Sequence, residues 1–210
     1  LPINGRPTLD HVLTAVSQAN IPRVCLITHH LEEQIQAFVG QGEKWGLKIS
    51  TIHQSQMLGT GHAVQTAVSA MPSWFNATFM VAATDYILPP TFLADLVQHH
   101  HDHSAAISLS LRHVPPAEQA KRSSVRYTAD FLISEVVEKP SAGQAPSPYS
   151  ANLIYILPPA VLPHVAAAQP SSRGEVELQT AVNALLASGT QAKGLLQPPL
   201  SEWRPPALHA

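Results

Sequence analysis

A glycine-rich turn carries residue types that suit the binding of a nucleobase. The strand predicted at 47–52 leads into Gln54, and Gly59, Thr60 and Gly61 then open a predicted helix. Glycine lets the main chain approach a ligand closely, threonine can cap the helix, and the glutamine amide offers a donor and an acceptor to the edge of a base. The same residues are also compatible with a simple turn from strand to helix, so the turn alone leaves both interpretations open.

A carboxylate stands at the end of a second apolar strand. The strand predicted at 78–83 leads to Asp85. A hard oxygen ligand at this place suits a Mg²⁺ ion that bridges phosphate groups. An aspartate at the end of a strand can equally cap the turn that follows, so a metal ligand and a structural cap are both open alternatives.

An acidic and a basic residue follow a third strand. Glu138 and Lys139 come directly after the strand predicted at 131–137, and Pro140 follows them. In isolation such a pair is typical of a solvated surface and contributes little to stability. Its position after a strand, which it shares with Gln54 and Asp85, is what singles it out.

The pattern of apolar residues indicates an α/β fold that brings these strand ends to one edge. Helical and strand patterns alternate over the first two thirds of the chain, and such strands pair in a mostly parallel sheet through right-handed crossovers. In open parallel sheets, ligands bind beyond the carboxyl ends of the strands, where the three polar clusters are predicted. Predicted helices span 7–16, 31–39, 63–71 and 92–97, and predicted strands span 24–27, 47–52, 78–83 and 105–111.

The remaining third of the chain departs from this alternation. The strand patterns at 124–127 and 131–137 have no full helix between them, which predicts an antiparallel hairpin added to the sheet. A further strand is predicted at 151–157, and a last amphipathic helix at 175–187. The expected fold class is therefore α/β, a Rossmann-like three-layer αβα sandwich with a mostly parallel mixed sheet and an added antiparallel hairpin.

Composition excludes several classes of protein. The 210 residues are 45% hydrophobic, and the longest apolar runs are far shorter than the roughly 20 residues of a membrane helix, so neither a disordered nor a membrane-spanning chain is expected. The formal net charge of −2 argues against nucleic acid as a partner. A single cysteine excludes an internal disulfide and a cysteine-rich zinc site. Because no basic and apolar leader opens the chain, a cytoplasmic location is expected.

The turn after Gln54 resembles the base-binding loop of sugar-phosphate nucleotidyltransferases, a family that includes N-acetylglucosamine-1-phosphate uridyltransferases and glucose-1-phosphate thymidylyltransferases. In that family a glutamine precedes a Leu-Gly-Thr-Gly/Ala-His-Ala run, which residues 58–63 match. The resemblance implies that Gln54, Gly59 and Thr60 contact the pyrimidine ring of a nucleotide, with Leu58 in the same nucleotide-binding loop. It extends over nearly all of the chain.

The other two clusters also match motifs of this family. Asp85 stands where the family has a Leu-x-Gly-Asp stretch whose aspartate helps to bind the catalytic Mg²⁺, although Thr84 replaces the usual glycine. Glu138 and Lys139 match a Val-Glu-Lys-Pro motif, in which the glutamate accepts sugar hydroxyl groups and the lysine pairs with the sugar phosphate. Asn152 lies in a strand similar to the family's sugar-contacting Asn-Ala-Gly-Ile-Tyr strand, and a sugar contact and a loop end both remain open for it. By resemblance, Asp85 and Lys139 are the catalytic residues.

Both ends of the chain depart from the family pattern. Residues 1–7 resemble the tail of a Leu-Leu-Pro-Val-x-Gly-x-Pro run, so the Gly-x-Gly-Thr-Arg triphosphate loop and the first strand of the sheet are expected to lie upstream. Near the other end, Arg204 follows Trp203 where the family usually has Trp-x-Asp, and an arginine cannot bind Mg²⁺. The amides and cations of such a loop stabilise the charge that develops in phosphoryl transfer, so catalysis by this segment alone is not expected.

The resemblance supports three functional hypotheses. The first is nucleotidyl transfer from a nucleoside triphosphate to a sugar 1-phosphate, giving a nucleotide-sugar and pyrophosphate, by one domain with a nucleotide-binding half at 1–112 and a sugar-binding half at 113–210. The second is a non-catalytic nucleotide-sugar-binding or regulatory homologue that has lost the triphosphate loop. The third is a nucleotidyltransferase with another acceptor, such as choline phosphate. The base, the sugar and the formation of a homo-oligomer are left open.

Overall fold

The computed structural model describes residues 2–3, 5–86 and 88–198, which form two compact units. Each unit is made of separate stretches of the chain. The described residues of Leu1–Asn20, Met80–Leu157 and Gln191–Ala210 form the first unit, and Ile21–Phe79 with Pro158–Thr190 form the second. Within the described part of the chain, none of the helices has the length and apolar character that crossing a membrane requires.

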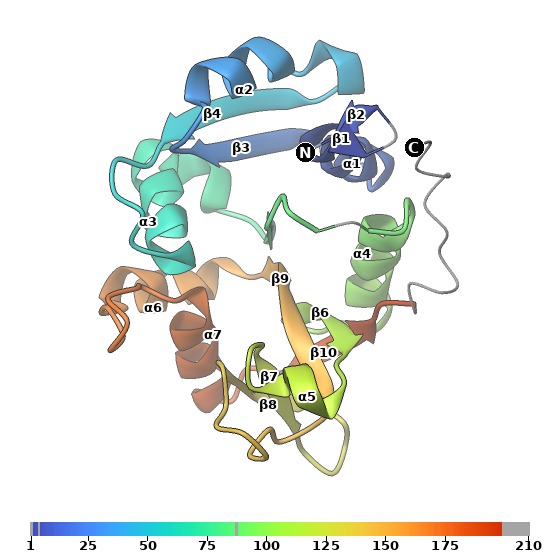
Figure 1. Ribbon diagram of the computed structural model, residues 1–210, viewed down its shortest axis with the longest axis vertical. Helices are drawn as coiled ribbons and strands as arrows, with labels where there is room; N and C mark the ends of the chain where they lie inside the picture. Colours follow the sequence, from blue (N-terminus) through green and yellow to red (C-terminus); the bar gives the residue numbers. More distant parts are fainter. Residues whose placement is uncertain (1, 4, 87, 199–210) are drawn as a thin grey trace. The chain divides into compact units, whose positions relative to one another are not determined.

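A pair of parallel strands organises the second unit (Figure 1). The strand β3 (Arg23–Thr28) pairs with β4 (Lys48–His53) along their full length. Parallel neighbours need a crossover connection, which is made by α2 (Glu32–Val39) and the 3₁₀ helix η1 (Glu43–Trp45). Because the strands are parallel and in register, they end side by side, with Thr28 opposite His53.

Helices from both stretches of the second unit pack against one another. The helix α3 (Thr60–Ala70) contacts α6 (Leu162–Ala167) and α7 (Leu178–Ala187). Between them, the Gln65 side chain donates a hydrogen bond to the Val165 carbonyl oxygen at 2.7 Å. The 3₁₀ helices η2 (Pro72–Phe75) and η3 (Pro159–Val161) flank this group.

A six-stranded mixed sheet, in the order β5-β9-β6-β10-β8-β7, forms the body of the first unit. The strand β10 is parallel to β6, whereas the pairs β6 with β9, β10 with β8, and β7 with β8 are antiparallel. The strands are β5 (Phe79–Ala82), β6 (Ile107–His113), β7 (Ser124–Tyr127), β8 (Ile133–Val137), β9 (Tyr149–Leu157) and β10 (Ala192–Leu196).

Two helices accompany this sheet. The helix α1 (Thr8–Gln18) contacts α4 (Phe92–Asp102), and α4 also contacts β6 and β10. Leu93, Leu96 and Leu109 are fully buried, and each such side chain stabilises the fold by roughly 1.5–3 kcal/mol. The short antiparallel pair β1 (Pro2–Ile3) and β2 (Arg6–Pro7) precedes α1, and α5 (Pro116–Gln119) is a single turn.

The structure confirms the expected α/β class, with a mixed sheet and the predicted antiparallel hairpin of β7 and β8. The apolar pattern does not predict β10, because Lys193 and Gly194 interrupt it. Gly194 packs closely there, since a Cβ atom at this position would lie 2.2 Å from Leu111 Cδ1 on the neighbouring strand, and the Leu111 side chain would have to shift. This strand is therefore fixed by its neighbours rather than by its own sequence.

The last helix begins later than the sequence predicts. The predicted start at 175 is wrong, because α7 begins at Leu178. The Val176 N–H donates to the Leu58 carbonyl oxygen at 2.6 Å, and the Val176 carbonyl oxygen accepts from the Gly61 N–H at 2.7 Å. Both backbone groups of Val176 thus bind a distant turn, so this residue is not available to begin the helix.

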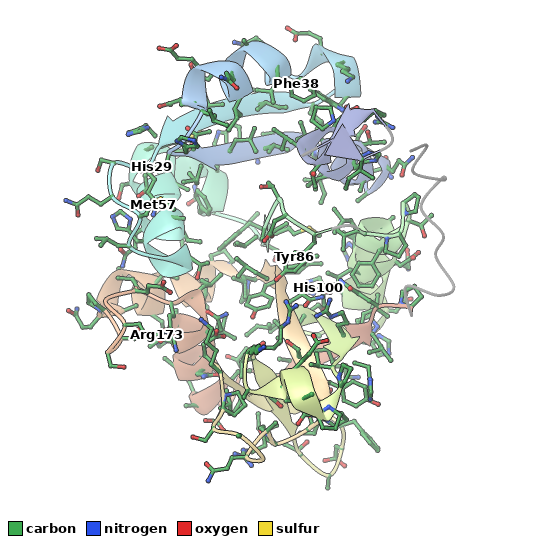
Figure 2. All side chains as sticks on the ribbon, viewed as in Figure 1. His29, Phe38, Met57, Tyr86, His100 and Arg173 are labelled. Atoms are coloured by element: carbon green, nitrogen blue, oxygen red, sulfur yellow. The ribbon has the colours of Figure 1, made fainter. Side chains whose placement is uncertain are left out.

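Acidification should destabilise the first unit through His100. The Nδ1 atom of His100, on α4, lies 2.9 Å from Ser108 Oγ on β6, and Figure 2 labels this histidine. Burial, and then the nearby His101, lower the pKa of His100 below the ordinary value of about 6.5. The unfolded chain therefore binds this proton first as the pH falls. The stabilising contribution of neutral His100 is complete above about pH 6.5 and is lost at lower pH.

Urea-denaturation midpoints measured at about pH 7.5 and about pH 5 check this expectation. The midpoint of the wild type should fall more on acidification than that of His100→Gln. The variant His30→Gln, which changes an exposed histidine, should behave like the wild type. Equal falls for the wild type and His100→Gln would contradict the role given to His100.

Candidate functional site

The backbone of Gln54 is fixed where β4 ends. Its N–H donates to the Thr28 carbonyl oxygen at 2.7 Å, so the parallel pairing with β3 continues one residue beyond the strand. Its own carbonyl oxygen accepts a hydrogen bond from His29 Nδ1 at 2.7 Å. The residue is only 9% exposed. The start of the predicted base-binding turn is therefore held firmly by β3 and the residue that follows it.

The Gln54 side chain is engaged by its own turn. Its Nε2 atom lies 2.7 Å from His62 Nδ1 and 3.4 Å from the Gly59 carbonyl oxygen. His62 stands in the first turn of α3. The carboxamide predicted to read a base is thus oriented by a partner eight residues further along the chain.

The end of the turn is clamped by a segment from the second stretch of this unit. The two backbone hydrogen bonds of Val176, with Leu58 and with Gly61, hold the two sides of Gly59 against the chain before α7. Gly59 has φ 98° and ψ −178°, which is a conformation that other residues avoid. A Cβ atom on it would lie 2.8 Å from the Val176 carbonyl oxygen. The close approach that glycine permits here is made by the protein's own backbone.

The predicted role of Thr60 as the cap of its own helix is wrong. α3 begins at Thr60 after Gly59, and no side-chain hydrogen bond caps it. Thr60 Oγ1 instead accepts a hydrogen bond from the N–H of Leu178, the first residue of α7, at 3.2 Å. Thr60 therefore satisfies a free N–H group at the start of a different helix, which strengthens the clamp around Val176.

A polar cluster beside this turn was missed by sequence reasoning. His53 Nδ1 lies 2.7 Å from Glu32 Oε2, and the other carboxylate oxygen of Glu32 accepts from Thr28 Oγ1 at 3.1 Å. The rings of His29 and His53 stack with their centroids 5.7 Å apart. Figure 2 labels His29 at the end of β3 and Met57 on the turn before α3. In the sequence, the run of polar residues directly after the first parallel strand is the pattern that could have indicated this cluster.

In the first unit, the turn that carries Asp85 is tied to β9. The Ala83 N–H donates to the Leu153 carbonyl oxygen at 2.8 Å, and the Leu153 N–H donates to Tyr86 Oη at 3.3 Å. Figure 2 labels Tyr86 at this place. Asp85 itself is exposed, whereas Asn152, next to Leu153 on β9, is 3% exposed. The predicted metal ligand and the predicted sugar contact thus belong to adjoining segments.

Glu138 and Lys139 follow β8, whose last residue pairs with Ser124 on β7. The preceding Ser123 donates from Oγ to the Ala151 carbonyl oxygen at 2.7 Å, which joins the start of β7 to β9. The exposed Lys139 has φ 45° and donates its N–H to the Arg122 carbonyl oxygen at 3.1 Å. β9 therefore connects, near 151–153, with both the Asp85 turn and the segment opposite the end of β8.

The predicted site residues divide between the two units. The nucleotide-binding turn belongs to the second unit, and the predicted metal and sugar residues belong to the first. The second unit holds Gln54, Leu58, Gly59 and Thr60, and the first holds Asp85, Glu138, Lys139 and Asn152. Trp203 and Arg204, where the sequence departs from the family pattern, lie outside the described residues.

Comparison with known proteins gives a family match over most of the chain. Residues 1–203 match the family described as nucleotidyl transferase. The chain is 26% identical over 190 residues to a low-salt glycan biosynthesis nucleotidyltransferase of Haloferax volcanii, covering 90% of the chain and 51% of that protein. It is 28% identical over 193 residues to a glucose-1-phosphate thymidylyltransferase of Streptomyces griseus, covering 92% of the chain and 52% of that protein.

A third relative is the bifunctional protein GlmU of Rhodococcus opacus, with 31% identity over 143 residues that cover 67% of the chain and 29% of the relative. The chain thus spans about half, or less, of the length of these relatives. Each of the three alignments covers two thirds of this chain or more.

Solved structures support the fold. A UDP-glucose pyrophosphorylase complexed with UDP-glucose has a TM-score of 0.81 and 20% identity, covering 94% of this chain and 82% of that one. A protein from Bacillus anthracis, described as a glucose-1-phosphate thymidylyltransferase in complex with a sucrose, has a TM-score of 0.79 and 21% identity. The match covers 94% of this chain and 77% of that one. At these identities the likeness establishes a common fold.

The variant Gly59→Ala tests the clamp around Val176. We expect a loss of roughly 1–3 kcal/mol in the free energy of unfolding, because the new Cβ atom meets the Val176 carbonyl oxygen and the backbone conformation is strained. Gly143→Ala is a matched control, since Gly143 also has a positive φ, of 75°, but no atom lies within 4 Å of its added Cβ. Urea denaturation measures both variants. If Gly59→Ala lost no more free energy of unfolding than Gly143→Ala, the close packing of Gly59 against Val176 would be refuted.

Proposed function

Because this chain belongs to the nucleotidyl transferase family, we propose that it holds a nucleoside triphosphate and a sugar 1-phosphate for nucleotidyl transfer, which yields a nucleotide-sugar and pyrophosphate. The observation that carries the proposal is the turn 54–61, whose only buried carboxamide, that of Gln54, is fixed in orientation within a clamped backbone. A preorganised polar group of this kind suits selective recognition of a small ligand.

The nucleobase binds at this turn. Gln54 supplies a side-chain amide, and Leu58, Gly59 and Thr60 supply main chain that the clamp keeps rigid. A site whose polar groups are already held in place loses little conformational entropy when the ligand arrives. The base therefore fixes the orientation of the nucleotide, and so the direction in which its phosphates extend.

Asp85 is the ligand for Mg²⁺. Its carboxylate is exposed at the end of β5, on a turn that the hydrogen bonds to Leu153 hold in place. Mg²⁺ usually keeps several waters and is bound through one or two carboxylates together with substrate phosphates, so a single accessible carboxylate fits this ion. When bound, Mg²⁺ neutralises charge that develops on the transferring phosphates.

The sugar 1-phosphate binds along the β9 side of the first unit. Lys139 is exposed and offers an ammonium group to the phosphate, and we assign the half-buried Glu138 and the buried Asn152 to the sugar. In the proposed reaction, an oxygen of the sugar phosphate attacks the α-phosphorus in line, and pyrophosphate leaves without a covalent intermediate on the protein. The contribution of the chain is positioning and charge stabilisation.

The variant Gln54→Leu tests the nucleotide site. Isothermal titration should show that UDP-glucose, or another nucleotide-sugar of a panel, binds the wild type in the presence of Mg²⁺. Gln54→Leu should bind the same ligand about tenfold more weakly, because one hydrogen bond to the base is lost. Gln41→Leu, at an exposed glutamine of the same unit, should leave binding unchanged. Unaltered affinity in a folded Gln54→Leu variant would refute the assignment.

The variant Asp85→Asn tests the metal site separately. The wild type should bind a nucleoside triphosphate more tightly with Mg²⁺ than with EDTA, and Asp85→Asn should lose most of this gain, because a neutral amide is a poor ligand for Mg²⁺. Asp130→Asn, in the exposed turn between β7 and β8, is the control. The same gain from Mg²⁺ in Asp85→Asn and in the control would exclude Asp85 as the ligand.

A further inference from the structure

The hydrogen bond between Gln54 and His62 determines which atoms of the carboxamide are free. Nε2 lies 2.7 Å from His62 Nδ1 and 3.4 Å from the Gly59 carbonyl oxygen. A carbonyl oxygen can only accept, so the amide nitrogen, and not the amide oxygen, must face Gly59. Both amide hydrogens are then directed within the turn. The Oε1 atom, which can only accept, remains for a ligand.

This orientation requires a particular form of His62. To accept from Nε2, the Nδ1 atom of His62 must carry no proton, so the ring is neutral with its proton on Nε2. The opposite tautomer would place two donors against each other. The carboxamide would then turn over, and its oxygen would face the Gly59 carbonyl oxygen while its nitrogen faced the ligand. The tautomer of His62 therefore selects an acceptor or a donor at the place where the base binds.

His62 is itself held at a fixed position. It lies in the first turn of α3. The two residues before it are both held by hydrogen bonds, Gly61 to Val176 and Thr60 to Leu178. The His62 carbonyl oxygen also accepts from Thr66 Oγ1 at 2.9 Å. Gln54 is fixed independently by its backbone hydrogen bond to Thr28. Each partner therefore has its own backbone anchor within the protein.

The ring can also be reached by solvent. His62 lines an open pocket of about 550 Å³ along α3, together with Ile52, Gln65 and Thr66. A polar ring nitrogen on this side can therefore be hydrated, and Nε2 can keep its proton without a protein partner. Access of water to the ring is therefore compatible with the tautomer that the hydrogen bond to Gln54 requires.

From these contacts we infer that His62 is a positioning residue for base selection: it holds the Gln54 carboxamide with Oε1 towards the ligand, so that the turn selects a base with a ring N–H donor, of the uracil or thymine type. Uracil and thymine carry a hydrogen on N3, whereas cytosine has a lone pair there, which an acceptor repels. This inference rests on the proposed function of the turn and adds the residue that sets its selectivity.

The test compares UDP-glucose with CDP-glucose, which differ in the base alone, by isothermal titration. The wild type should favour UDP-glucose by about tenfold or more, the effect of one hydrogen bond gained and one repulsion avoided. In His62→Leu the carboxamide is free to turn over, so this ratio should fall to about threefold or less. His62→Asn should restore the preference, because its side-chain oxygen can accept from Gln54 as Nδ1 does. His30→Leu, at an exposed histidine, is the control.

The double variant His62→Leu/Gln54→Leu separates positioning from a general structural role. If His62 acts through Gln54, the double variant should show the same ratio as Gln54→Leu. An equal weakening of both ligands in His62→Leu, with the ratio unchanged, would overturn the inference. In the ligand-free protein, ¹⁵N spectra should report His62 with its proton on Nε2, and a proton on Nδ1 would also overturn it. Failure of the wild type to bind any nucleotide-sugar would instead refute the proposed function, and the base-selecting role with it.

Discussion

The second unit depends on the pair of backbone hydrogen bonds that Val176 makes with Leu58 and Gly61. They bring an extended segment against a turn that is remote in sequence, and they explain several features at once. Gly59 must be glycine because the segment passes too close for a side chain, and α7 begins only at Leu178 because Val176 is already engaged. The Thr60 hydroxyl completes the arrangement by binding the first N–H of α7. The turn that we assign to the base is therefore rigid before any ligand binds.

In the first unit, β9 has a comparable organising role. Its residues near Leu153 bind the turn that carries Asp85, and Ala151 accepts from Ser123 at the start of β7. The turn after β5 and the start of β7, which are separated along the chain, are thus connected through one strand. A strand in the interior of a sheet can do this because its backbone groups and its flanking turns meet neighbours on both sides.

The sequence was sufficient to predict the α/β class, the parallel pair β3 and β4, and the hairpin of β7 and β8, because each has a local apolar period. It could not predict β10, because Lys193 and Gly194 interrupt the apolar pattern, and the glycine packs closely against Leu111 of the neighbouring strand. Within the candidate site, the motif identified Gln54 and the turn, but the roles of His62, His29 and Thr60 depend on partners that no local period reveals. Thr60 illustrates the limit: its residue type was correctly recognised as a helix cap, yet the helix that it serves lies more than a hundred positions away.

Each unit is assembled from stretches that are not contiguous, and this affects how the protein acquires its structure during synthesis. Residues 21–79 leave the ribosome well before 158–190, with all of 80–157 between them. The parallel pair β3 and β4 can form early, but the clamp on Gly59 has to wait for Val176 to be synthesised. Contacts of such long range are slow to form because a long loop must close first. Until the last third of the chain emerges, the turn that we assign to the base therefore lacks its contacts with Val176. Chaperone binding to the nascent chain is expected mainly in that interval.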